Sequence, residues 1–84
     1  MTWQIQWSVP AERTLKALHW RIAARIDAAI LRFAESGEGD VFRRAEDTAV
    51  TVRLRVETRG VLITHDRATG SLTIWSIYTL PPRR

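Results

Sequence analysis

The stretch AVTVRLRVETRGVLITHD, residues 49–66, decides which fold this sequence can adopt. Apolar residues occupy every second position of its first half, at Val50, Val52, Leu54 and Val56. A period of two is typical of a strand with one buried face. Arg53 and Arg55 fall between these positions and are therefore expected to project from the opposite face. Residues 60–65 predict a neighbouring strand.

The N-terminal half predicts one strand followed by a helical segment. Residues 2–8 alternate apolar and polar side chains, which is typical of a strand. Residues 11–35 carry apolar residues at spacings of three and four, which form one helical stripe. A single helix of that length would run about 37 Å, whereas a compact domain of this size has a radius of gyration of about 12 Å. We therefore expect a bend around residues 19–21, and a left-handed cap at Gly37 or Gly39.

The C-terminal part predicts a turn and a last strand. Residues 66–70 form the turn, in which Gly70 is free to adopt a positive φ. Residues 71–80 form the strand. The order strand, helical hairpin and three strands predicts an α+β fold, with a small, mostly antiparallel sheet covered on one face by the helices. At 84 residues, the whole chain is expected to form a single domain, 1–84.

The positive charge of this sequence is concentrated in its second half. The net charge is +4, and residues 49–84 hold six arginines against two acids, whereas residues 1–48 hold seven basic groups against seven acids. Planar guanidinium groups suit bidentate contact with phosphate better than lysine does. An ordinary solubilising surface is the alternative explanation for the same composition.

The sequence also indicates in which cellular compartment the protein is expected. There is no cysteine, so disulfides and thiolate chemistry are excluded. No signal-peptide pattern is present, and no apolar run approaches the length of about 20 residues that a membrane span needs. We therefore expect a cytoplasmic protein that does not associate with membranes.

The order and lengths of these segments resemble the RelE/ParE superfamily of small bacterial toxins. The resemblance covers nearly the whole chain, and its most recognisable parts are LKAL…RIAARIDAAILRFAESGEGD and VRLRVETRGVLITHD. It implies a RelE-like β-α-α-β-β-β fold and a toxin of a type II toxin–antitoxin module, held inactive by a cognate antitoxin. RelE-like members cleave messenger RNA in the ribosomal A site. ParE-like members share the fold but poison DNA gyrase without cleaving RNA.

Metal-free RNA cleavage requires a general base, charge stabilisation at phosphorus and a proton for the leaving oxygen. The resemblance places Arg53 at a position that is Lys or Arg in many RelE-like toxins, and Arg55 beside it as a second phosphate ligand. Arg59 is displaced by one position, with Gly60 where the family has its arginine, and a bulge there would return its side chain to the active face. His65 is the candidate general base, because some RelE-like enzymes use histidine.

The C-terminus departs from the family pattern. Family members commonly end with an arginine and, a few residues later, a tyrosine; here Arg83 stands in for the arginine, with Arg84 as a further phosphate ligand, but no tyrosine follows. Strict alternation groups Tyr78 with the apolar positions of the last strand, which predicts packing. We also expect Trp3 and Trp7 to pack in the core rather than to stack on bases, with Trp75 less clearly assigned.

Three functions remain open at this point. The first, which the arginine placement favours, is a ribosome-dependent endoribonuclease whose catalytic residues are Arg53, Arg59, His65 and Arg83, without metal or cofactor. The second is a ParE-like gyrase inhibitor, and the third is a catalytically degenerate module that binds an antitoxin. The first mechanism requires guanidinium groups on an uncovered sheet face, so intramolecular ion pairs or a covering loop there would count against it.

Overall fold

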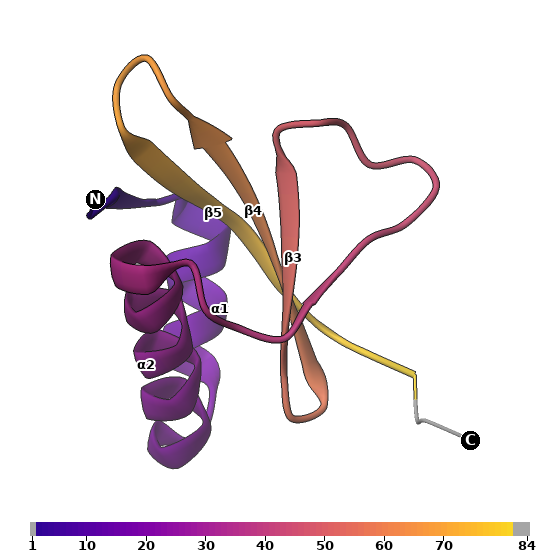
Figure 1. Ribbon diagram of the computed structural model, residues 1–84. Coiled ribbons are helices and arrows are strands. Elements are labelled where there is room, and N and C mark those ends of the chain that lie inside the picture. Colours follow the sequence, from indigo (N-terminus) through magenta and orange to yellow (C-terminus); the bar gives the residue numbers. More distant parts are fainter. Residues whose placement is uncertain (1, 82–84) are drawn as a thin grey trace.

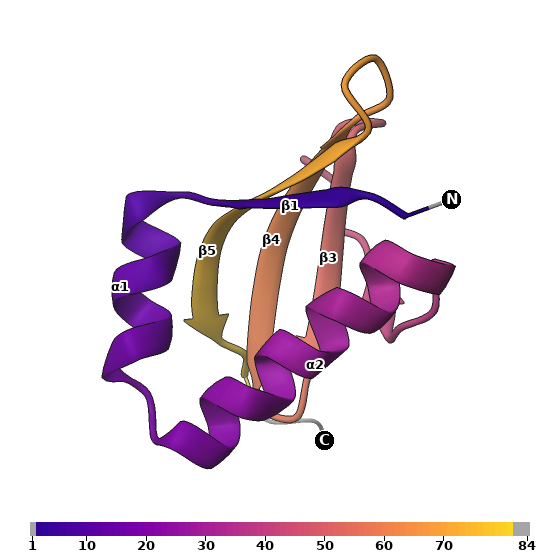
Figure 2. The ribbon, with the colours of Figure 1, turned by 90° about the vertical axis from the view of Figure 1, so that its left-hand side faces the viewer.

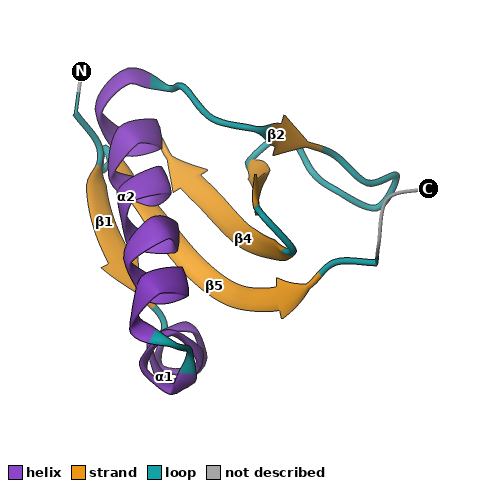
Figure 3. Cartoon of the chain, turned by 90° about the horizontal axis from the view of Figure 1, so that it is seen from below, coloured by secondary structure: helices purple, strands orange, loops and turns teal. Residues whose placement is uncertain are grey.

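The structure, a computed structural model, describes residues 2–81. Its elements are β1 (Gln4–Trp7), α1 (Val9–Ala17), α2 (Trp20–Ser36), β2 (Val41–Phe42), β3 (Thr51–Val56), β4 (Arg59–Asp66) and β5 (Ser71–Thr79). The strands form one sheet in the order β1-β5-β4-β3-β2, in which β1 runs parallel to β5 and every other pair is antiparallel. Both helices lie on the same face of this sheet (Figures 1 and 2). The predicted α+β fold is confirmed, with the two-residue strand β2 as an addition (Figure 3).

The helical segment bends where the sequence predicts it. Ser8 caps α1 by accepting a hydrogen bond from the backbone N–H of Ala11 (3.3 Å). The chain leaves the helical conformation at Leu18 and His19, whose ψ angles are 155° and 138°. Gly37 ends α2 with a φ of 74°, the left-handed cap that a glycine adopts without steric cost.

The core lies between α2 and the sheet. Its largest fully buried side chains are Ile26, Ile30, Leu54, Val61, Ile63, Leu72 and Ile74. Val52 and Val56 pack against this cluster, so the apolar side of β3 faces the helices as predicted. Trp3 and Trp7 also pack against it, half-buried, in agreement with the sequence.

A β-bulge interrupts the pairing of β4 with β5. Leu62 pairs with Ser76 and the next residue, Ile63, pairs with Ile74, so Trp75 is an extra residue on β5. A residue inserted in this way shifts the alternation of the strand by one position. Side chains on either side of Trp75 therefore follow opposite parities.

The bulge corrects the expectation for Tyr78. Before it, Leu72 and Ile74 face the helices; after it, the buried residue is Ile77. Tyr78 follows Ile77 and consequently lies on the face opposite the helices. Strict alternation fails here because Trp75 has no partner on β4, so the residues that follow it lie on the opposite faces from those expected.

The turns agree with the sequence at Gly70, whose φ is 65°. The tight connection between β3 and β4 instead places Glu57 at a φ of 57°, and its carboxylate forms an ion pair with Arg25 on α2. Within residues 2–81, neither helix has the length and apolar character needed to cross a membrane.

Candidate functional site

The face of the sheet opposite the helices carries Arg53 and Arg55, two of the site residues predicted from the sequence; we call it the helix-free face. It is formed by Thr51, Arg53, Arg55, Leu62, Thr64, Trp75 and Tyr78 from β3, β4 and β5. In Figure 1 this face is turned away from the two helices, and the segment between β2 and β3 lies on the same side of the sheet as this face.

That segment, residues 43–50, is a loop held in shape by its own hydrogen bonds; we call it the covering loop. Arg43 Nη2 donates to the carbonyl of Thr48 (3.0 Å), and the N–H of Arg44 donates to Asp47 Oδ2 (2.8 Å). The N–H of Asp47 donates back to the carbonyl of Arg44 (3.0 Å). The hydroxyls of Thr48 and Thr51 meet at 3.0 Å and join the loop to β3. These bonds hold Asp47 beside the sheet.

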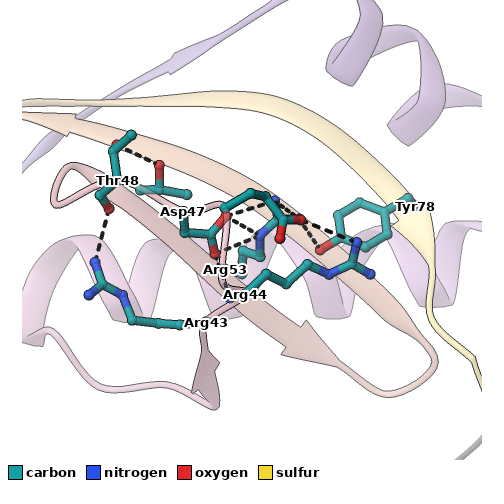
Figure 4. Close-up of polar contacts among 8 residues, drawn as sticks. Arg43, Arg44, Asp47, Thr48, Arg53 and Tyr78 are labelled. Carbon is teal, nitrogen blue, oxygen red and sulfur yellow. Dashed lines mark hydrogen bonds and ion pairs between the residues drawn. The ribbon is translucent and has the colours of Figure 1, made fainter.

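Arg53 is engaged by Asp47 in a bidentate ion pair (Figure 4). Its Nε lies 2.9 Å from Asp47 Oδ2, and its Nη2 lies 2.9 Å from Asp47 Oδ1. Only 11% of the Arg53 side chain and 3% of the Asp47 side chain are exposed. Hydrogen bonds from Arg53 and from the Arg44 backbone lower the pKa of Asp47, and the bonds to Asp47 and Tyr78 raise the pKa of Arg53. Both groups are therefore charged throughout the physiological pH range.

Tyr78 is the third member of this cluster. Its hydroxyl accepts a hydrogen bond from Arg53 Nη1 (2.8 Å), and the guanidinium of Arg44 lies 5.7 Å from the centre of its ring (Figure 4). The ring crosses directly over Gly60, where a Cβ atom would come within 2.5 Å of Tyr78 Cζ. Glycine at position 60 is thus required for the ring to reach Arg53.

Arg55 lies on the same face, farther along β3. Its guanidinium is 5.6 Å from the ring centre of Phe42, and it lines a hollow of about 650 Å³ together with Asp40 and Glu57. The side chain is half-buried. It therefore offers a partly accessible cation between an aromatic ring and two carboxylates.

Arg59 lies on the helix side of the sheet. Residues 59–66 of β4 alternate regularly, and Arg59 has the same parity as the buried Val61. Its Nη1 donates to the hydroxyl of Thr79 (2.9 Å). Gly60 pairs in register with Arg55, and the irregularity of the sheet lies two residues later, so no bulge returns Arg59 to the helix-free face.

His65 is also on the helix side. It pairs directly with the buried Leu72, and its ring packs edge-on against Trp3, with the ring centres 5.7 Å apart. Its Nδ1 is buried and has no hydrogen-bond partner within residues 2–81. The sheet thus separates this imidazole from Arg53. The sequence already indicates the side on which His65 lies, because His65 follows the apolar Val61 and Ile63 at alternate positions of the strand.

Of the site residues predicted from sequence, the structure brings Arg53 and Arg55 together and adds Tyr78, which the bulge hid from sequence reasoning. Arg83 and Arg84 lie outside the described residues. Arg53 is ion-paired with Asp47 and covered by the covering loop. This arrangement counts against a mechanism in which Arg53 is freely exposed to RNA. Asp47 was missed because nothing in the local sequence indicates its partner. Within residues 2–81 no cluster of three His, Cys, Asp or Glu side chains has metal-binding geometry.

Comparisons with solved structures match nearly the whole chain. The isolated RelE toxin of Escherichia coli superposes with a TM-score of 0.80 at 6% identity, covering 98% of this chain and 88% of that one. The toxin–antitoxin complex RelBE2 of Mycobacterium tuberculosis gives 0.76 at 19% identity, covering 94% and 99%. The chain has the RelE fold. The YoeB dimer of Staphylococcus aureus gives 0.76 at 13% identity, covering 96% and 100%.

No protein-family model and no curated protein matches the sequence. The likeness to RelE therefore rests on the fold alone, at 6–19% sequence identity. On this RelE fold, the described part of the helix-free face combines a phenol, two arginines and an ion-paired aspartate. Such a set can bind a phosphate and donate a proton to it.

Proposed function

We propose that this protein is the toxin of a bacterial type II toxin–antitoxin module, held inactive in the cytoplasm by a cognate antitoxin. The RelE fold over nearly the full chain supports this proposal. Two of the similar structures are complexes, RelBE2 of Mycobacterium tuberculosis and RelE–RelB of Pyrococcus horikoshii. An antitoxin that binds this chain would cover the helix-free face or hold the toxin away from its target.

We propose further that the target is messenger RNA on the ribosome and that the helix-free face receives the scissile phosphate. The contact of Arg53 Nη1 with the Tyr78 hydroxyl (2.8 Å) carries this proposal. Cleavage would proceed by attack of the 2′-hydroxyl on phosphorus, with the hydroxyl proton passing to solvent water, and by departure of the 5′-oxygen. Arg53 would stabilise the phosphorane charge, and the Tyr78 hydroxyl would give its proton to the leaving oxygen.

In this proposal Asp47 occupies the place of the substrate until RNA binds. Two oxygens of a phosphate can accept the same pair of parallel hydrogen bonds from a guanidinium as the two oxygens of a carboxylate do. Nε and Nη2 of Arg53 now bind Asp47, so binding of RNA requires the covering loop to release them. Arg44, whose guanidinium lies over the Tyr78 ring, would supply a second cation to the phosphate.

The placement of Arg59 and His65 favours a second candidate. Both lie on the helix side, so Arg59 cannot join Arg53 at a phosphate and His65 cannot serve as general base there. A ParE-like gyrase inhibitor, or a module that only binds an antitoxin, needs no such base. The second candidate uses the same fold and the same antitoxin but leaves RNA intact.

Induction of the gene alone in a bacterial host separates these functions. Rapid arrest of protein synthesis with cleaved messages would support the ribonuclease, whereas an SOS response with intact messages would support gyrase inhibition. Undisturbed growth would leave only the antitoxin-binding module. Arg53→Ala and Tyr78→Phe should abolish message cleavage, and Arg32→Ala, an exposed substitution on α2, is the matched control.

A further inference from the structure

Trp75 is held rigidly with nearly half of its surface in solvent. Its side chain lies at the bulge of β5, and 48% of the residue is exposed. The indole Nε1 donates a hydrogen bond to the hydroxyl of Thr64 (2.7 Å), and the Trp75 carbonyl accepts one from Ser8 Oγ (2.9 Å). A ring fixed at its polar edge retains its flat apolar surface for a ligand.

A row of hydroxyl groups adjoins this ring on the helix-free face, beside the apolar side chain of Leu62. Thr51, Thr64 and Thr73 stand directly opposite one another across β3, β4 and β5, and Trp75 follows Thr73 by two positions. A row of hydroxyl groups does not form the apolar groove that a hydrophobic peptide segment would fill. An aromatic plane beside hydroxyl groups suits a ligand that is flat and polar at its edges.

Charge favours the same kind of ligand. The covering loop and β3 carry four arginines (Arg43, Arg44, Arg53 and Arg55) and two acids (Glu46 and Asp47). Cations interleaved with exposed aromatic rings are typical of surfaces that bind single-stranded nucleic acid. Bases stack on the rings while the cations follow the phosphates.

The bulge places both aromatic residues of β5 on this surface. Without the extra residue, Trp75 and Tyr78 would have opposite parities and only one of them could occupy the helix-free face. With it, they lie three positions apart on the same face, at a separation of about 10 Å along the strand. A short single strand can span this distance between a stacked base and a phosphate at Arg53.

We propose that Trp75 is a stacking platform for a nucleobase of single-stranded RNA, and that the bulge of β5 places it on the same face as the Arg53–Tyr78 pair. The inference rests on the proposed RNA-binding function and assigns a base subsite to it. Thr64 is the positioning residue, because its hydroxyl fixes the plane of the indole.

Equilibrium binding tests this directly. The purified full chain is titrated into a fluorescently labelled, 2′-O-methylated single-stranded RNA, which cannot be cleaved, and anisotropy is recorded. Trp75→Leu should weaken binding by roughly 5-fold or more, the effect of losing one stacked base. Trp20→Leu is the matched control, because Trp20 is still more exposed but begins α2 on the other side of the sheet; it should bind as the wild type does. Thermal melting verifies that both variants are folded.

An oligonucleotide with abasic sites distinguishes stacking from charge. Wild type and Trp75→Leu should bind the abasic strand equally, and Thr64→Val should weaken binding of the intact strand while leaving the abasic strand unaffected. Equal affinity of Trp75→Leu and wild type for intact RNA would overturn the platform and leave the proposed function standing. Failure of the wild type to bind any RNA would overturn both. If the variant lost affinity only for the antitoxin, Trp75 would be a protein contact and the inference would be wrong.

Discussion

At the scale of single residues, the pair of Asp47 and Arg53 determines what the helix-free face can do. A guanidinium with both carboxylate oxygens in reach and little solvent contact is fixed in one rotamer. In the proposed function, this geometry orients the Arg53 guanidinium for a phosphate, while the Asp47 carboxylate occupies the N–H groups that the phosphate would use. The pair therefore links the stability of the folded protein to access to its site.

Asp47→Asn should lower the stability of the protein and increase its affinity for RNA. The amide keeps the shape of the side chain but removes the charge that Arg53 requires, while Arg53 becomes available to phosphate. Urea unfolding at pH 7 and RNA anisotropy measure the two effects. Glu12→Gln is the control, because it removes the same charge from an exposed pair with Lys16 on α1; it should change the affinity for RNA little and the stability much less than Asp47→Asn does. A variant with unchanged stability and unchanged affinity would contradict the role assigned to Asp47.

The stability difference between wild type and Asp47→Asn should disappear in acid. The pKa of Asp47 is lowered in the folded state by its bonds to Arg53 and Arg44, so its ionised form stabilises the fold above the ordinary pKa of about 3.9. This contribution is lost as the pH falls through the lower, folded-state pKa. Urea unfolding from pH 7 to pH 2 should show a full difference at neutral pH that shrinks below about pH 4. A difference that stays constant over this range would exclude the carboxylate as its source.

Gly60→Ala should displace the Tyr78 ring. The added Cβ would lie 2.5 Å from Tyr78 Cζ, which is closer than such atoms approach in folded proteins. The variant should be destabilised and should lose any activity that depends on Tyr78. In a Tyr78→Ala background the same substitution should cost much less, because the clash is gone. A double-mutant cycle by urea unfolding measures this coupling, and additive effects would contradict the contact.

At the scale of elements, α2 supplies the cover on which the sheet depends. Ile26 and Ile30 are fully buried against β3, β4 and β5, whereas Leu31, the next residue, is 45% exposed. The two-residue β2 and the covering loop carry no comparable buried surface. The helix side therefore holds the packed apolar core, whereas the covering loop is held to the sheet mainly by polar contacts, above all the pair of Asp47 with Arg53.

Ile30→Ala should destabilise the protein by about 2–5 kcal/mol, the usual cost of a cavity in a packed core. Leu31→Ala should stay within about 0.5 kcal/mol of the wild type, because it removes exposed surface on the same helix. Chemical unfolding of both variants gives the comparison. Similar losses in the two would mean that α2 does not pack on the sheet as described.

At the scale of the whole molecule, the sheet separates a mainly apolar side, covered by the helices, from a side that carries several arginines. Apolar side chains, the Trp3–His65 contact and Arg59 lie beneath the helices, and the arginines of the covering loop and β3 gather on the other side. With a net charge of +4, the protein should attract a polyanion chiefly toward the helix-free face.

Binding of single-stranded RNA should weaken steeply with salt, and Arg44→Ala should reduce that dependence. Each phosphate contact on a single strand contributes about −0.7 to the slope of log K against log salt. Removing Arg44 should make the slope shallower by about that amount, whereas Arg32→Ala, on α2, should leave it unchanged. Anisotropy titrations at several salt concentrations provide the slopes. Equal changes in both variants would indicate diffuse attraction without a defined face.

The sequence by itself determined the helices and every strand except β2, and their order. Alternation in β3 predicted which side of that strand is buried and that Arg53 and Arg55 oppose it. The length of the helical stripe predicted the bend, and glycines predicted left-handed turns at Gly37 or Gly39 and at Gly70, of which Gly37 and Gly70 adopt them. These features follow from local backbone preferences and from a periodicity that the chain carries within one segment.

Only the tertiary structure decided what meets on the helix-free face. The bulge at Trp75 arises from pairing between β4 and β5, and it moved Tyr78 to the side where Trp75 and Arg53 lie. The carboxylate of Asp47 reaches Arg53 only because the covering loop closes back onto β3. Register and loop closure are set by contacts between distant segments, and these contacts leave no periodic mark in either segment alone.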